Sequence, residues 1–279
     1  MADATMTASH PTPGATRLPA VQRVVGGQVW YQLLLLMRNP RALMAGIVMP
    51  GLLLALRLGR FHHASAQPAG TVAALVAGLI VFGILGTAYL SHAASLVIAR
   101  EDGVLRRWRA TPLPTWGYFT GRIAATVLAA DASALVLVLV GVSMAGLHVT
   151  AGMAVSLLIA ATLGGLAWAA VGTAVTAVIP TAQSTNPILV LTFLPVLLFS
   201  GSLGDVNGLP QWLTTAASYL PAQPVIDAAT RALSHTGPGI ALLPVRDLLV
   251  LLCWTLAGLL ISVRFFRWNP HRPSHAARR

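Results

Sequence analysis

The chain has 279 residues, of which 56% are hydrophobic and 9% charged, and its net charge is +11. Soluble domains carry about a quarter charged residues, so this composition excludes a water-soluble globular protein. The arginines recur at the ends of apolar runs, which is typical of membrane orientation rather than of nucleic-acid binding. We expect one all-α integral membrane domain over residues 21–266 and no nucleic-acid partner.

The N-terminal segment begins with a polar tail. Residues 1–20 lack the apolar core of a signal peptide, so we expect a disordered cytosolic tail. The apolar run Val29–Met37 that follows is too short to cross a bilayer. Trp30 at its start and Arg38 at its end predict an amphipathic helix in the membrane interface. An alternative joins residues 29–56 into one broken crossing.

Six later segments are apolar enough to be spans. A helical crossing needs about 20 mostly apolar residues, and the first segment is short for this requirement. The predicted spans are residues 42–58, 71–98, 123–147, 152–179, 188–204 and 246–265. A basic cytosolic tail is expected at 267–279.

The arginines also predict the orientation. With both termini in the cytosol, fourteen arginines lie inside and four outside, as the positive-inside rule requires. All basic residues are arginine, and the chain is rich in Ala, Gly and Val, which hints at a GC-rich bacterial genome. We therefore expect a multi-pass protein of the bacterial plasma (inner) membrane.

One cytosolic window concentrates charge. Six of the 25 charged residues lie between Arg100 and Arg109. On a helix, Val104, Leu105 and Trp108 share one face and the arginines take the other. This pattern predicts one short amphipathic helix, with its acids in the first turn and a stop at Pro112. Two interpretations remain: a basic loop held on anionic lipid, or a helix docked into a protein groove.

The long connection after the fifth span is expected outside. Pro210 and Pro221 bound a predicted amphipathic helix, and a second is expected at about 222–234. The apolar stripe of the first helix is formed by Trp212, Leu213, Ala216, Tyr219 and Leu220. We expect two half-buried helices that cap the outer end of the bundle.

Two segments carry a family resemblance. The run "REDGVLRRWRATPLPTWGYFTGR" and the stretch "FLPVLLFSGSLGDVNGLPQWLTTAASYLPAQPVIDAATRAL" resemble ABC-2 type transporter permeases. The resemblance implies six spans, an interface helix at about Val21 to Arg38, and a coupling helix at about Arg100 to Thr111. It further implies a dimer of permease chains on two separate ATPase subunits, and drug or antibiotic resistance exporters among close relatives. Many members begin the coupling segment Glu-Glu or Glu-Arg, whereas this chain has Arg100-Glu101-Asp102.

The resemblance implies an ATPase-coupling set in the charged window. Its members are Arg100, Glu101, Asp102, Gly103, Leu105, Arg106, Arg107, Trp108 and Arg109. The chain contains no lysine and so cannot form a P-loop. We expect a non-catalytic subunit that binds no cofactor directly, while a partner ATPase uses ATP and Mg²⁺.

Other functions fit the sequence less well. An intramembrane protease lacks support, because Ser200 and Ser202 do not fit G-x-S-x-G and no H-E-x-x-H run occurs. An ion-coupled carrier should show several intramembrane acids and an internal repeat. The apolar spans favour a drug-like, antibiotic or lipid-like amphipathic cargo, with polysaccharide export as the alternative.

Two polar residues lie deep in the predicted spans. His92 and Asp131 are both about 12–13 Å from the inner boundary at 1.5 Å per residue. An unpaired carboxylate there is costly, so we expect the two side chains to approach each other, directly or through water. The alternative is local bonding, of Asp131 to Ser133 or Thr126 and of His92 to Ser91 or Ser95. With a single cysteine, Cys253, no thiolate metal cluster is expected.

Overall fold

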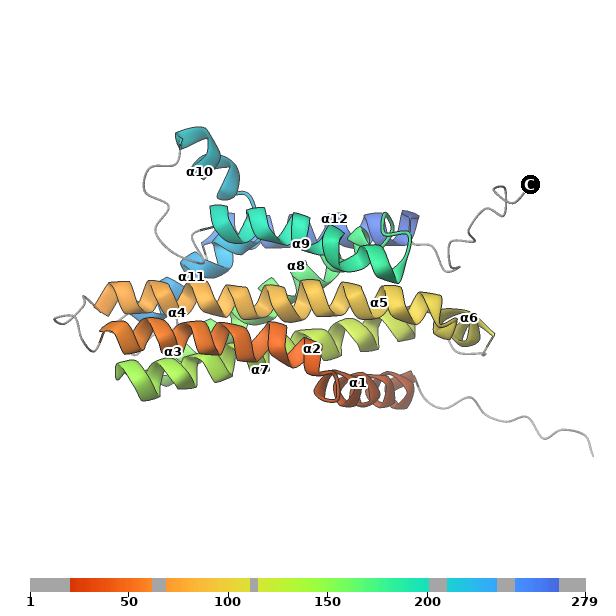
Figure 1. Cartoon of the computed structure of the whole chain (residues 1–279), viewed down its shortest axis with the longest axis horizontal. Helices are drawn as coiled ribbons and strands as arrows, with labels where there is room; N and C mark the ends of the chain where they lie inside the picture. Colours follow the sequence, from red (N-terminus) through yellow and green to blue (C-terminus); the bar gives the residue numbers. More distant parts are fainter. Residues whose placement is uncertain (1–20, 62–68, 111–114, 201–209, 235–243, 266–279) are drawn as a thin grey trace, which may run out of the picture.

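The computed structural model describes residues 21–61, 69–110, 115–200, 210–234 and 244–265, and every element in these ranges is a helix (Figure 1). The predicted tails at 1–20 and 267–279 lie outside the described residues, as does Pro112. The all-α fold class is confirmed.

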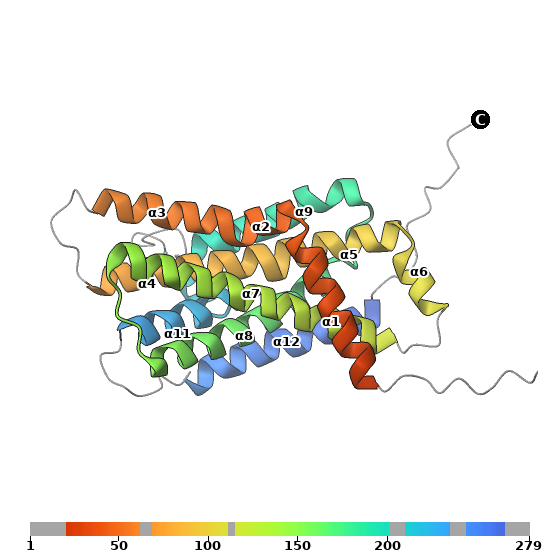
Figure 2. The ribbon, with the colours of Figure 1, turned by 90° about the horizontal axis from the view of Figure 1, so that it is seen from below.

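The N-terminal part contains two separate helices. Helix α1 spans Val21–Met37 and crosses α7 obliquely (Figure 2). A continuous helical segment then begins at Pro40, made of α2 (Pro40–Leu43), the π-helical η1 (Met44–Val48) and α3 (Met49–Phe61). The chain turns at Arg38 and Asn39, as expected where proline fixes the start of a helix.

Five described helices are long and apolar enough to cross a membrane. They cover Gly70–Glu101, Trp116–Ala145, Ala151–Val175, Ala182–Phe199 and Val245–Phe265, and Met44–Gly59 is a shorter apolar helix. The first of the five is built from three consecutive elements, α4 (Ala69–Ile84), the π-helical η2 (Leu85–Ser91) and α5 (His92–Glu101). The other four belong in order to α7 (Thr115–Ala145), α8 (Ala151–Val175), α9 (Ala182–Phe199) and α12 (Val245–Phe265).

The long helices give the bundle two distinct ends (Figures 1 and 2). Helices α1 and α6 (Val104–Arg109) lie at one end, together with the connection from α8 to α9. Helix α10 (Gln211–Ala217) lies at the other. We call these the α6 end and the α10 end.

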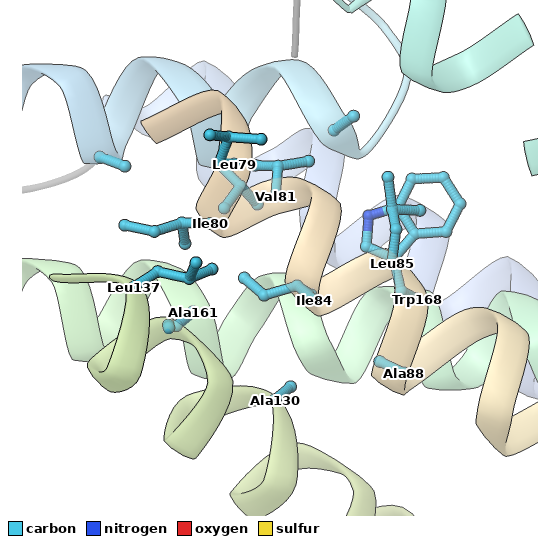
Figure 3. Packing of buried hydrophobic residues seen from close by; sticks show 14 of the residues in the cluster. Leu79, Ile80, Val81, Ile84, Leu85, Ala88, Ala130, Leu137, Ala161 and Trp168 are labelled. Atoms are coloured by element: carbon cyan, nitrogen blue, oxygen red, sulfur yellow. The ribbon is translucent and has the colours of Figure 1, made fainter. Parts of the chain in front are cut away.

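The core is centred on α4 and η2. Ile80 and Leu85 belong to one buried cluster with Leu137 of α7 and Trp168 of α8 (Figure 3). Helix α11 (Ala222–Ser234) also packs against α4 and α8. A Cβ added at Gly164 of α8 would lie 2.6 Å from the Val225 side chain, so a glycine is needed there for close packing.

The two π-helical segments meet where helices approach closely. A Cβ on Gly86 would lie 2.2 Å from the carbonyl oxygen of Ala45. The Ser133 hydroxyl of α7 donates to the carbonyl of Gly46. Small residues allow such backbone contact between membrane helices. Neither π-helical segment is predicted from the sequence.

The helices α1, α10 and α11 are not among the five candidate spans, and they differ in which of their residues are buried. On α1, Gln28 and Gln32 are buried while Trp30 and Met37 are exposed, so this helix turns an apolar face outward. On α10, Ala217 is buried, whereas Trp212 is 71% exposed. The predicted buried stripe through Trp212 and Tyr219 is therefore wrong. Of the two helices in this connection, α11 has more buried residues than α10.

Candidate coupling site

The charged window forms two helices instead of the single helix predicted over Arg100–Arg109. Helix α5 ends at Glu101, and Gly103 adopts a left-handed conformation with φ of 69° before α6 begins. Glycine takes this conformation without a steric penalty. The first turn of α6 contains no acid, so the predicted helix-dipole role of Glu101 and Asp102 is wrong.

The apolar face of α6 is buried, as its pattern predicts. Leu105 is fully buried and packs with Leu96 and Tyr118. The rings of Trp108 and Tyr118 lie 5.4 Å apart between centroids. Trp108, which is half-buried, therefore anchors α6 on its own chain, and its predicted contact with an ATPase stays a prediction.

The opposite face of α6 is open. Arg106, Arg107 and Asp102 are exposed, and Gly103 is half-buried. An Arg107 Nη2 donates to the backbone carbonyl of Asp102 over 3.4 Å. The side chain of Arg109 lies outside what the structure describes. Arg106 and Arg107 thus form the exposed basic face of α6.

Arg100 points into the protein. Only 1% of the residue is exposed, and its guanidinium donates to the carbonyls of Thr176 (3.1 Å) and Ile179 (2.6 Å). The last carbonyls of a helix lack intrahelical partners and favour a nearby cation. Arg100 therefore caps the C-terminal end of α8 and faces its own chain, and its place in the ATPase-coupling set stays a prediction.

Glu101 makes the complementary contact. Its Oε1 accepts a hydrogen bond from the backbone N–H of Ala182 over 2.7 Å. Ala182 is the first residue of α9, and a carboxylate is favoured at a helix N-terminus. Adjacent residues of opposite charge thus hold the end of α8 and the start of α9. We call these contacts the α8–α9 brace.

Sequence reasoning missed this inward role, although one signal was present. Leu96, Val97 and Arg100 follow the i, i+1, i+4 spacing of one helix face, and all three are buried. Arg100 thus continues a buried stripe of α5.

Further hydrogen bonds join α5 to its neighbours. His92 Nδ1 lies 2.8 Å from the Thr126 hydroxyl of α7, and His92 Nε2 lies 2.9 Å from the Thr173 hydroxyl of α8. Arg122 of α7 donates to the Ser95 hydroxyl of α5 over 2.6 Å. These bonds tie α5 to both α7 and α8.

The expected direct bond between His92 and Asp131 is not present. Both ring nitrogens of His92 contact threonines, while Asp131 Oδ2 accepts from the Thr162 hydroxyl over 3.0 Å. The local alternatives are wrong in detail too, because Ser133 donates to a carbonyl of η1. Hydroxyls on adjacent helices provide partners that sequence separation does not reveal.

The described residues form no group of three His, Cys, Asp or Glu side chains suited to a metal ion. They define a polytopic helical membrane protein in which α6 is partly exposed at one end of the bundle and the preceding helix α5 is bonded to α8 and α9. Residues 27–233 match the family model of the ABC-2 type transporter. The match covers well over half of the chain, so the protein belongs to the ABC-2 type transporter family and is an ABC permease. Comparison with curated proteins gave no match.

Proposed function

We propose that the chain is the permease subunit of an ATP-driven exporter in the bacterial plasma membrane. A separate ATPase subunit binds and hydrolyses ATP with Mg²⁺, while the permease itself binds no cofactor. The arginine distribution supports a cytosolic α6 end and cytosolic termini. Residues 40–61 form a continuous helix about 33 Å long at 1.5 Å per residue, which supports a sixth crossing of a roughly 30 Å hydrocarbon core.

The observation that carries this proposal is that the α5–α6 segment exposes basic side chains at one place and bonds neighbouring helices at another. Arg106 and Arg107 are exposed at the α6 end, while Arg100 caps α8. A partner that pushes on α6 therefore acts on a segment bonded to α8 and α9. The Arg100 contact with α8 is buried and charge-assisted, so it resists separation, and Glu101 adds an exposed charge-assisted bond to the start of α9. Movement of α6 is therefore passed to both helices.

The cargo is proposed to be amphipathic, of a drug-like, antibiotic or lipid-like class. The described spans are dominated by apolar residues, which suits a molecule taken up from the membrane. Export is part of the same proposal, in which the cargo is taken up from the inner leaflet. A polysaccharide path would be expected to display more polar and aromatic side chains.

A second permease chain is proposed to complete the transport path. Helix α9 packs chiefly against α5, η2 and α10. Its outer side exposes large apolar residues at Val190, Leu191, Leu194 and Leu198. A weakly packed helix with this surface suits a permease–permease contact.

The ATPase dependence is tested by reconstitution. The purified permease should hydrolyse no ATP, whereas its complex with the cognate ABC ATPase should do so. Arg106→Glu with Arg107→Glu should weaken assembly of that complex without unfolding the permease, because both residues are exposed. The control variant is Arg264→Glu, which reverses an exposed charge on α12 near the α6 end and should leave assembly unchanged. Arg231→Glu would not serve, because it would break the salt bridge between Arg231 and Asp247. Wild-type assembly in the double variant would refute the proposal.

A further inference from the structure

An open groove lies near the α10 end, between α12 and the turn that follows α10. It has a volume of about 430 Å³ and is lined by Tyr219, Arg246, Leu249, Val250, Cys253 and Trp254. The α12 residues follow the i, i+3, i+4, i+7, i+8 spacing of one helix face. Ligand pockets in proteins commonly begin at about 300 Å³, so this groove is large enough for part of a ligand.

The wall of the groove is held by specific contacts. Trp254 Nε1 donates to the backbone carbonyl of Tyr219 over 2.7 Å. Arg246 donates to the Ser218 hydroxyl over 2.9 Å, and its guanidinium lies 5.3 Å from the centre of the Tyr219 ring. These bonds join α12 to the turn after α10 and fix a cation at the groove.

The acids of this region are engaged elsewhere. Asp247, next to Arg246 in the chain, forms a 2.7 Å salt bridge with Arg231. Asp227 accepts a hydrogen bond from Gln223 over 2.9 Å. Its carboxylate also feels the charges of Arg231 and Arg246 without a direct bond to Arg246. Within the described ranges, Arg246 forms no salt bridge. No carboxylate of the described residues therefore contacts its guanidinium directly, and an anion in the groove can do so.

We propose that this groove binds an anionic phospholipid, with the phosphate at Arg246 and an acyl chain along Leu249, Val250 and Cys253. The length from Arg246 to Trp254 is about 12 Å at 1.5 Å per residue, so the groove runs from the end of a span into one leaflet. A guanidinium binds phosphate well, and tyrosine and tryptophan favour the membrane interface. In the proposed topology this is the outer leaflet.

The native cysteine gives a direct readout of occupancy. Cys253 is exposed and is the only cysteine of the chain, so alkylation by N-ethylmaleimide reports this position alone. The full-length chain in detergent is titrated with phosphatidylglycerol or with phosphatidylcholine, and the alkylation rate is measured by mass spectrometry. Bound lipid should cover the thiol, with half-maximal protection at about fivefold less phosphatidylglycerol, the preference expected for one basic residue near anionic lipid.

Matched variants separate charge from groove shape. Arg246→Gln should abolish the fivefold preference, whereas Arg264→Gln, on the same helix, should keep it. Leu249→Trp should fill the groove and remove lipid-dependent protection, and Leu260→Trp should not. Leu249 and Leu260 are both more than half exposed, so neither change disrupts the core.

Three results would overturn the proposal: equal protection by the two lipids in the wild-type chain, an unchanged preference in Arg246→Gln, or an alkylation rate that no lipid changes. The last result would also arise if another protein chain covers the groove. The assay requires no ATPase and no transport, so its outcome is independent of the proposed export function.

Discussion

Arg100 and Arg106 are six residues apart, yet the structure gives them opposite roles. Arg100→Ala removes the donor to two carbonyls at the end of α8. Leaving buried polar groups unsatisfied costs about 1–3 kcal/mol each, so we expect a loss of at least about 2 kcal/mol in the free energy of unfolding. Arg106→Ala should change it by less than about 0.5 kcal/mol but should weaken ATPase binding. Unfolding in detergent and a binding assay measure the two effects.

This comparison has a clear contradicting result. If Arg100→Ala is as stable as the wild-type chain, the α8–α9 brace contributes nothing to the fold. Glu101→Ala tests the other half of the brace. It should cost about 1 kcal/mol, the usual value for loss of a helix N-terminal acceptor.

His92 and Asp131 test a second residue-scale relation. Because they bond different threonines, the effects of His92→Ala and Asp131→Ala on unfolding free energy should add to within about 0.5 kcal/mol. His92→Ala and Thr126→Val should not add, since these residues contact each other. A strong coupling between His92 and Asp131 in this double-mutant cycle would instead indicate a direct or water-mediated pair.

At the scale of elements, Gly103 sets the direction of α6 relative to α5. A Cβ at Gly103 would have open space, with the nearest atom 3.8 Å away, so Gly103→Ala changes only the backbone preference. The left-handed conformation should then cost about 1–2 kcal/mol, and coupling to the ATPase should fall as α6 shifts. Gly146→Ala is the matched control. Gly146 follows the last residue of α7, has φ of 63°, and leaves open space for an added Cβ.

Both glycine variants should lose similar stability, measured by thermal unfolding, but Gly103→Ala alone should impair stimulation of ATP hydrolysis. Equal coupling in the two variants would mean that the direction of α6 is unimportant. Gly103→Asn should lie between wild type and Gly103→Ala, because asparagine tolerates this conformation better.

The elements also show what the sequence could and could not predict. Apolar length predicted the five helices that are long and apolar enough to cross a membrane, and the helical spacing of Leu105 and Trp108 predicted the face on which α6 packs against its own chain. The break at Gly103 was missed because a glycine inside a helical pattern is often tolerated. The inward turn of Arg100 and the threonine partners of His92 depend on which helices are neighbours in space, and one sequence does not contain that information.

At the scale of the whole molecule, the proposed second chain gives a test of assembly. In a Cys253→Ala background, Leu191→Cys and Leu194→Cys on α9 should form interchain disulfides when membranes are treated with an oxidant such as copper–phenanthroline. Leu260→Cys on α12 should not, although Leu260 and Leu191 are similarly exposed, at 69% and 74%. The measurement is dimer formation on a non-reducing gel. Dimers from the α12 position alone would place the interface elsewhere.

The central claim is that the exposed basic face of α6 contacts the ATPase. Site-specific photo-crosslinking tests it most directly, with a benzophenone amino acid at Arg106 or Arg107 and, as control, at Trp212 on α10. All three positions are exposed, and the control lies at the opposite end of the bundle (Figure 1). We predict crosslinks to the ATPase from Arg106 and Arg107 and none from Trp212. The absence of crosslinks from both α6 positions in an assembled, active complex, or equal crosslinking from Trp212, would contradict the account.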